Sequence, residues 1–258
     1  IPKVVIGCRD PFDAVNGKGI EKLRAAGVEV IEGVLERECR ELNKRFFTFH
    51  EKHRPWILLK WAQTGDGFIA ADQNTPRLLI SNEYTNRLVH QRRSEEAGIL
   101  VGTNTALLDD PGLTNRLWDG PSPVRLVMDM DLRLPASLKL FNRAQKTVVF
   151  NSVKSEELEN LIYYRLEKNK SLISQLMSAL YNLGIQSVLV EGGTRLLQSF
   201  IDDGTWDEAR IISNNKLFTG NGLAAPVLQT GQLTGKLEIL SDEIRTLKNT
   251  GPHKTNEI

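Results

Sequence analysis

The sequence has few cysteines, no excess of charge of one sign and no long apolar run. Two cysteines in 258 residues, Cys8 and Cys39, are too few for a disulfide framework or a cysteine-based zinc site, and they fit a reducing compartment. Lysine and arginine total 33 against 32 acidic residues, so no basic field attracts nucleic acid. No apolar stretch approaches the roughly 20 residues of a membrane helix, and no signal peptide is visible. We therefore expect a cytoplasmic protein that binds neither nucleic acid nor membrane and holds any anionic ligand with local groups.

Apolar, β-branched runs alternate with amphipathic segments along most of the chain. The runs that predict strands are KVVIG (3–7), VEVIEG (28–33), WILLKWAQ (56–63), ILVGTN (99–104), VRLVMD (124–129), TVVFN (147–151), SVLV (187–190), EARIIS (208–213) and LEIL (237–240). Helices are predicted at 17–27, from 35 onward, at 81–97 with Ser81 as N-cap, at 105–111, at 171–183 and from 194. This alternation predicts an α/β domain of about 200 residues, with a mainly parallel central sheet flanked by helices.

Residues 1–52 form a block of their own before a charged stretch at 50–55, where we place a domain boundary. The chain begins almost directly in a strand, which indicates a piece of a longer protein. Within the block, apolar residues recur at helical spacing at Leu35, Cys39, Leu42, Phe46 and Phe49. This spacing predicts one helix with Cys39 in its buried face, and a reactive thiol is the alternative. His50 and His53 have a spacing that suits a metal, but no third ligand is near, so we assign no metal site.

Two glycines separate a buried strand from an amphipathic helix in SVLVEGGTRLLQSFIDDG, residues 187–204. Gly192 and Gly193 precede a helix that starts near Thr194, where free backbone N–H groups and the helix dipole favour a phosphate. The alternative is a tight turn without a ligand. The pattern is not G-x-G-x-x-G, and no G-x-x-x-x-G-K-[ST] loop occurs in the sequence, which disfavours a Rossmann or P-loop nucleotide site.

Polar residues follow the strand predicted at 187–190 and surround the strand predicted at 99–104. A carboxylate at the carboxyl end of a buried strand, Glu191, must find donors, because burying it unpaired is costly. A pyrimidine or pterin edge offers such donors, and a salt bridge to a structural arginine is the alternative. Arg93 precedes the strand predicted at 99–104, and Arg116 lies just past the loop after it. Together they would clamp a phosphate or carboxylate; taken separately, each is a solvated surface charge. Thr105 and Asp109 could bond a ribose or a carboxamide, or only cap their helical turn.

The stretches VGTNTALLDDPGLTNR, PVRLVMD and SVLVEGGTRLLQSF closely resemble the C-terminal reductase domain of the bifunctional riboflavin biosynthesis deaminase and reductase family. The resemblance covers about residues 55–245, and its motif T-x-L-x-D-[DN]-P-x-L-T-x-R is specific. Residues 4–47 resemble the last third of the zinc-dependent deaminase domain of that family. The deaminase motifs H-x-E and P-C-x-x-C are absent here, so zinc and deamination would belong only to a part outside this sequence.

The resemblance implies a domain order and a chemistry. Residues 1–52 would be the end of a deaminase-like domain, 53–248 the reductase domain and 249–258 a flexible tail. It also implies a dihydrofolate-reductase-like fold, NADPH as hydride donor, a small phosphoribosylamino-pyrimidine substrate and a homodimer. The implied reaction reduces the ribosyl group of 5-amino-6-(5-phosphoribosylamino)uracil to ribityl, with hydride delivered to C1′ of the opened ribose.

Site residues carry over from the family position by position. Contacts with NADP are implied for Ala62, Thr105, Asp109, Gly193, Thr194, Arg195 and Leu196, the last four within a run that extends to Ser199. Substrate contacts are implied for Arg93, Leu113, Arg116 and Glu191, with the arginines at the 5-phosphate and Glu191 at the pyrimidine. Lys60 falls on the strand lysine of the family, near the reacting groups, and with Glu191 makes the catalytic pair. Asp66 would only turn the chain.

The sequence departs from the family at one segment. TPRLLIS stands where many members have G-x-S-x-W-I, so Leu79 replaces a tryptophan that packs on the cofactor and Arg77 replaces a serine near the phosphate. Arg77 could itself add a phosphate ligand. Ser152 and Lys154 could meet the 2′-phosphate of the cofactor, or lie in a solvated loop.

Two rival functions remain open at this stage. One is a reductase of the same fold that acts on a folate or another pterin. The other is a nucleotide-binding remnant without catalysis, which the partial deaminase block favours. The arginine pair and Glu191 favour the phosphorylated pyrimidine over a pterin.

Overall fold

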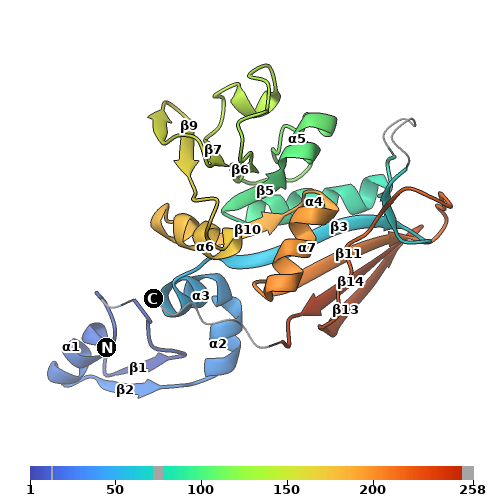
Figure 1. Ribbon diagram of the computed structural model, residues 1–258. Helices are drawn as coiled ribbons and strands as arrows, with labels where there is room; N and C mark the ends of the chain where they lie inside the picture. The colour runs from blue at the N-terminus through green and yellow to red at the C-terminus, as the bar shows by residue number, and fades with distance from the viewer. Residues whose placement is uncertain (13, 72–77, 252–258) are drawn as a thin grey trace.

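The computed structural model describes residues 1–12, 14–71 and 78–251 (Figure 1). The strands are β1 Lys3–Ile6, β2 Glu29–Glu32, β3 Trp56–Thr64, β4 Phe68–Ala70, β5 Gly98–Gly102, β6 Val124–Met128, β7 Thr147–Asn151, β8 Glu156–Leu158, β9 Leu161–Arg165, β10 Ser187–Val190, β11 Glu208–Asn214, β12 Leu223–Ala224, β13 Gln232–Ile239 and β14 Asp242–Lys248. The helices are α1 Lys18–Ala25, α2 Glu36–Leu42, α3 Lys44–Lys52, α4 Glu83–Glu95, α5 Thr103–Asp109, α6 Leu172–Asn182 and α7 Thr194–Asp203, with a 3-10 turn at Lys139–Phe141.

A ten-stranded sheet forms the centre of the molecule, in the order β13-β14-β11-β3-β10-β5-β6-β7-β9-β8. All neighbours from β11 to β9 are parallel, whereas β14, β13 and β8 join antiparallel at the two ends. The predicted α/β fold with a mainly parallel sheet is therefore confirmed. Within the described ranges, no helix is both long and apolar enough to cross a membrane.

Helices cover both faces of this sheet, because side chains alternate along each strand. On one face, Ile57 and Leu59 of β3 pack in a core that includes Leu176 of α6 and Phe200 of α7. On the other face, residues such as Leu58 form a second core with α5 and the following loop. Figure 1 shows α6 and α7 on the near side of the sheet and α4 behind β3. The carboxyl ends of β3, β10 and β5 consequently lie between the helices of the two faces.

The edges of the sheet depart most from the sequence prediction. LEIL is part of a long hairpin, β13 and β14. The second strand of this hairpin was not predicted, because most of its residues are polar or charged and its two apolar residues, Ile244 and Leu247, do not alternate with them. The short pair β8 and β9 was also missed. The N-cap of α4 is Asn82 rather than Ser81, since the Asn82 side chain accepts the N–H groups of Tyr84 and Thr85, each at 3.0 Å.

The helix predicted from residue 35 is two helices with a break at Asn43, and its predicted buried face is wrong. Leu35 and Leu42 are 67% and 81% exposed, Cys39 is half-buried, and of the predicted set only Phe49 is fully buried. The Asn43 side chain donates to the Cys39 carbonyl at 2.9 Å, which ends α2 and lets α3 start in a new direction. Thus α2 buries no side chain, whereas α3 packs on the sheet domain.

The segment at the predicted domain boundary is tied closely to the sheet. Lys44 of α3 pairs with Glu208 of β11 at 3.0 Å, and Phe49 packs on Tyr181 of α6 with ring centroids 4.7 Å apart. Buried Arg54 forms two bonds of 2.7 and 2.8 Å to Asp207. At the other end, the Asn249 side chain donates to two carbonyls of the turn before β11. Residues 252–258 of the predicted tail lie outside the described residues.

Candidate active site

Two of the predicted site residues lie side by side on the central strands. Lys60 belongs to β3, and Glu191 directly follows β10, whose Val190 is in register with Leu59. The Glu191 N–H donates to the Leu100 carbonyl of β5 at 3.0 Å, so the backbone continues the parallel pairing at this point. The sequence therefore presents an amine and a carboxylate from adjacent strands toward the α4 face.

Arg93 of α4 closes this group. Its guanidinium makes two bonds to the Glu191 carboxylate, of 3.1 Å from Nε and 2.6 Å from Nη2, and the side chains are 14% and 9% exposed. The remaining Nη1 donates to the Thr114 carbonyl at 3.1 Å. The salt bridge that the sequence left as an alternative for Glu191 is thus present. In the predicted clamp of two arginines, Arg93 therefore offers little net charge to an anion, because Glu191 already neutralises it.

The three charges shift one another's protonation. Burial alone would raise the pKa of Glu191, but the charges of Arg93 and then Lys60 outweigh it and lower that pKa to about 2. Burial lowers the pKa of Lys60, and Glu191 only partly opposes this. The pKa of Arg93 is raised, because Glu191 outweighs its burial. The site therefore holds a firmly ionised carboxylate beside an amine that gives up its proton more easily than an ordinary lysine.

A cavity of about 220 Å³ lies between α4 and the sheet and reaches both Lys60 and Glu191. It is lined by Leu58, Lys60, Thr85, Leu88, Val89, Arg92, Leu189, Glu191, Arg210, Ile212, Gly235, Lys236, Leu237, Ile244 and Thr246. Its walls are mainly apolar, and the buried Thr85 hydroxyl has no hydrogen-bond partner among the described residues. The amine of Lys60 therefore borders open volume in the protein interior.

The loop after α5 lies on the other side of α4. Leu113, a predicted substrate residue, has φ 49° and a side chain only 2% exposed in the second core, so only its backbone is available to a ligand. Arg116 is exposed, and its guanidinium has no carboxylate partner within the described part of the chain. Its backbone N–H donates to Nδ1 of His90 at 2.9 Å. Sequence reasoning missed His90, although its place three residues before Arg93 puts both on one helix face.

The two glycines after β10 have different structural roles. A Cβ on Gly192 would lie 2.6 Å from the Cα of Val101, so this glycine is needed for the close approach of β10 and β5 rather than for a ligand. Gly193 has φ 55°, a conformation that favours glycine, and forms the N-cap of α7 without a side-chain cap. A Cβ on Gly193 would lie 3.2 Å from the Thr105 hydroxyl oxygen. The start of α7 and the first turn of α5 therefore meet here.

Several predicted cofactor residues gather at this end. Leu196 lies beside Gly102, the N-cap of α5, which also lacks a side-chain cap. The Thr194 hydroxyl donates to the Ala224 carbonyl at 2.7 Å, and Arg195 is exposed. Because free N–H groups at the start of a helix attract anions, the residues present fit the phosphates of a dinucleotide such as NADPH. Asp109 lies at the last position of α5.

Other predicted residues lie further from this centre. Ala62 is half-buried two positions beyond Lys60 on β3, Leu79 is exposed, and Arg77 lies outside the described residues. Asp66 accepts the N–H groups of Thr219 and Gly220 at 3.1 and 2.7 Å, which agrees with a role in turning the chain.

The two residues suggested for the 2′-phosphate already have partners. Ser152 donates to the Met130 carbonyl at 2.8 Å, and Lys154 pairs with Glu156 at 2.5 Å.

His50 packs against the rings of Phe12, Phe46 and Phe49. Across the described ranges, no group of three His, Cys, Asp or Glu side chains is arranged to hold a metal ion.

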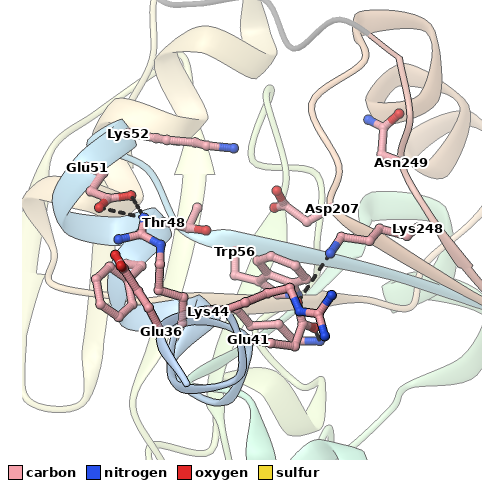
Figure 2. Close-up of a pocket in the computed structure, with 13 residues that line it drawn as sticks. Glu36, Glu41, Lys44, Thr48, Glu51, Lys52, Trp56, Asp207, Lys248 and Asn249 are labelled. Carbon is pink, nitrogen blue, oxygen red and sulfur yellow. Dashed lines mark hydrogen bonds and ion pairs between the residues drawn. The ribbon is translucent and has the colours of Figure 1, made fainter. Parts of the chain in front are cut away.

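A larger cleft of about 650 Å³ lies away from these residues, between α2, α3 and the start of β3 (Figure 2). Its charged side chains largely neutralise one another, as the pairs Arg40 with Glu51 at 2.6 Å and Lys248 with Glu41 at 3.2 Å show. No residue predicted from the sequence lines it. The candidate active site is therefore the group under α4 and the adjoining ends of β10 and β5.

Comparison with known proteins identifies the family of the chain. Residues 55–250 match the model of the RibD C-terminal domain. The chain is 36% identical to riboflavin biosynthesis protein RibD of Aquifex aeolicus, over 96% of this chain and 70% of the relative. It is similar, with a TM-score of 0.84 and 32% identity over 96% of this chain and 72% of the other, to a diaminohydroxyphosphoribosylaminopyrimidine deaminase/5-amino-6-(5-phosphoribosylamino)uracil reductase of Thermotoga maritima. RibD of Acinetobacter baumannii has the same fold, with a TM-score of 0.83 and 23% identity over 97% and 73%. The chain therefore belongs to the RibD family of riboflavin biosynthesis proteins.

Proposed function

We propose that this chain is an NADPH-dependent reductase that converts 5-amino-6-(5-phosphoribosylamino)uracil to its ribitylamino form. Its family membership and its similarity to a protein described as a reductase of this substrate support the proposal. The observation that carries it is the group formed by Lys60, Glu191 and Arg93, because it places an easily deprotonated amine beside a fixed carboxylate. The exposed guanidinium of Arg116, which has no carboxylate partner among the described residues, lies on the loop that Arg93 holds.

The reaction requires a hydride, a proton and a bound phosphate. The ribosylamine ring opens to an imine at C1′, and NADPH, when bound, would supply the hydride for that carbon while the nitrogen takes up a proton. The lowered pKa of Lys60 suits its amine to hold the proton that balances the hydride. Arg116 binds the 5-phosphate, for which a guanidinium is well suited. The ionised Glu191 faces the pyrimidine donors with the lone pairs that Arg93 leaves free, and the start of α7 with Thr105 holds the cofactor phosphates.

Two broader features of the proposal rest on the family resemblance. Residues 1–52 would be the final part of a deaminase-like domain, and matches to full-length relatives extend over 96% of this chain. The enzyme would act as a homodimer.

The test follows NADPH oxidation with the phosphorylated pyrimidine, its phosphate-free riboside and dihydrofolate as separate substrates. The wild type should turn over the phosphorylated pyrimidine and leave dihydrofolate unreduced. Arg116→Met should raise KM for the phosphorylated substrate about tenfold or more, since one charge-assisted contact contributes roughly 1.5–3 kcal/mol. The same variant should scarcely change the kinetics with the riboside, because that substrate lacks the phosphate.

Arg37→Met is a matched control, because Arg37 is exposed on α2, outside the candidate site, and pairs with Glu38 next to it in the chain. It should behave as the wild type with every substrate. A folded wild type that oxidises NADPH with none of these substrates would remove the reductase proposal. Turnover of dihydrofolate instead would establish the pterin alternative.

A further inference from the structure

His90 joins α4 to the loop that carries Arg116. The ring is buried, and its Nδ1 accepts the Arg116 backbone N–H at 2.9 Å. Arg93, on the same face of α4, donates to the Thr114 carbonyl at 3.1 Å. The helix thus holds the loop backbone at two points, one on each side of Asn115. The Asn115 side chain in turn donates to the Gly120 carbonyl, which folds the rest of the loop back on itself.

The bond from Arg116 requires that Nδ1 carries no proton. Burial, followed by the charges of Arg93 and Arg116, lowers the pKa of His90, while Asn115 and Glu191 oppose this. These are the groups that face the ring: Arg93 from its own helix, Arg116 and Asn115 from the loop, and Glu191 from the end of β10. Protonation would set an N–H of the ring against the N–H of Arg116 and add a positive charge beside two guanidinium groups.

We propose that His90 is a positioning residue, whose neutral ring fixes the Arg116 backbone so that the exposed Arg116 guanidinium meets the substrate phosphate. This inference rests on the proposed function, in which Arg116 binds that phosphate. Protonation of His90 frees the loop on one side of Asn115. Phosphate binding then weakens on acidification, so KM rises while kcat changes much less.

Two substitutions separate acceptor, charge and packing. Asn carries its amide oxygen on Cγ, as His carries Nδ1, so His90→Asn retains an acceptor that cannot be protonated in this range. His90→Leu removes the acceptor and replaces the ring with an apolar side chain of similar size. At pH 8, His90→Leu should raise KM for the phosphorylated pyrimidine about tenfold, because it leaves the partly buried Arg116 N–H without its acceptor and releases the loop at this point. His90→Asn should stay near the wild type at pH 8. Toward pH 5 it should lose the part of the rise of KM that exceeds the rise caused by protonation of the substrate phosphate itself, whose second pKa is about 6.

His50→Leu is the control for the substitution itself, because His50 packs among phenylalanine rings outside the site and should leave KM and its pH profile unchanged. Titration of the His90 ring by NMR should show protonation over the same pH range as the rise in KM. The inference is overturned if His90→Leu keeps the wild-type KM, or if the rise of KM toward pH 5 is as large in His90→Asn as in the wild type.

Binding of ribose 5-phosphate, measured by calorimetry, keeps this test separate from the proposed reaction. If the wild type turns over no pyrimidine, but ribose 5-phosphate binds with the same dependence on pH and on the two His90 variants, only the proposed reaction fails. If turnover is normal and the affinity for ribose 5-phosphate is the same in the wild type and the two His90 variants, only the positioning role fails.

Discussion

Replacing Glu191 by glutamine should destabilise the protein as well as impair its activity. The variant leaves the Arg93 guanidinium, only 14% exposed, without its charge partner, and it removes the neighbour that favours a charged Lys60. Lowering the pKa of Glu191 from 4.5 to about 2 corresponds to roughly 3 kcal/mol in favour of the folded state at neutral pH, since a tenfold change in equilibrium is about 1.4 kcal/mol. Breaking a buried ion pair costs about the same. We expect the free energy of unfolding at pH 7 to fall by about 3 kcal/mol.

Denaturant unfolding at several pH values measures this directly. Since the pKa of Glu191 is lower in the folded state, its contribution is complete above about pH 4.5 and is lost as the pH falls toward 2. The difference between wild type and Glu191→Gln should therefore shrink over that range. The double variant Arg93→Met with Glu191→Leu removes both charges and should recover roughly half of the lost stability or more. It should not recover NADPH oxidation.

Two results would refute this reasoning. If Glu191→Gln unfolds at the denaturant concentration of the wild type at pH 7, the ion pair does not stabilise the fold. A difference that stays constant or grows between pH 4.5 and 2 would show that the carboxylate is not the titrating group. Recovery of both stability and turnover by the double variant would remove Glu191 from the catalytic site.

Two further predictions concern the same strands. Gly192→Ala should lose about 2 kcal/mol or more of stability in thermal or denaturant unfolding, because its Cβ would lie 2.6 Å from the Val101 backbone. Gly19→Ala is the control, since open space surrounds Gly19, and it should be neutral or stabilising. Equal effects of the two substitutions would contradict the packing argument. Lys60→Met should abolish most NADPH oxidation yet be at least as stable as the wild type at pH 7, because burial lowers the pKa of Lys60 in the folded state. The difference in the free energy of unfolding between variant and wild type should shrink as the pH rises toward the usual lysine pKa of 10.5, and a clear loss of stability at pH 7 would contradict this.

The sequence predicted the parallel centre of the fold well, because strands buried on both faces are apolar without interruption. Val190, Leu100 and Val127 lie in such runs, and each was assigned to a strand. The edges failed for the converse reason, since β14 pairs by backbone bonds and most of its side chains are polar or charged, without a regular alternation. The prediction of a buried face on α2 was wrong because it continued the helical spacing through Asn43. At this residue a side-chain bond to the backbone ends the helix.

The sequence located the candidate site but not its connections. Lys60 lies beside Glu191 because β3 and β10 are adjacent and parallel. Glu191 was predicted from its place at a strand end, whereas Lys60 was predicted from the family resemblance. Which donor satisfies Glu191 depends on a helix residue 98 positions away, and sequence spacing alone does not decide between Arg93 and a ligand. His90 escaped for a related reason: its partner is a backbone N–H of the loop, and a backbone group leaves no signal in the sequence.

The buried ion pair links substrate recognition to the placement of the loop. The Arg93 guanidinium reaches both Glu191 and the Thr114 carbonyl, so it holds the end of β10 and the Arg116 loop at once. A lysine at position 93 would carry the same charge but lacks the planar fork that bonds both groups together. The geometry of the proposed phosphate contact therefore depends on the Glu191 carboxylate, and substitution of Glu191 should alter the position of Arg116.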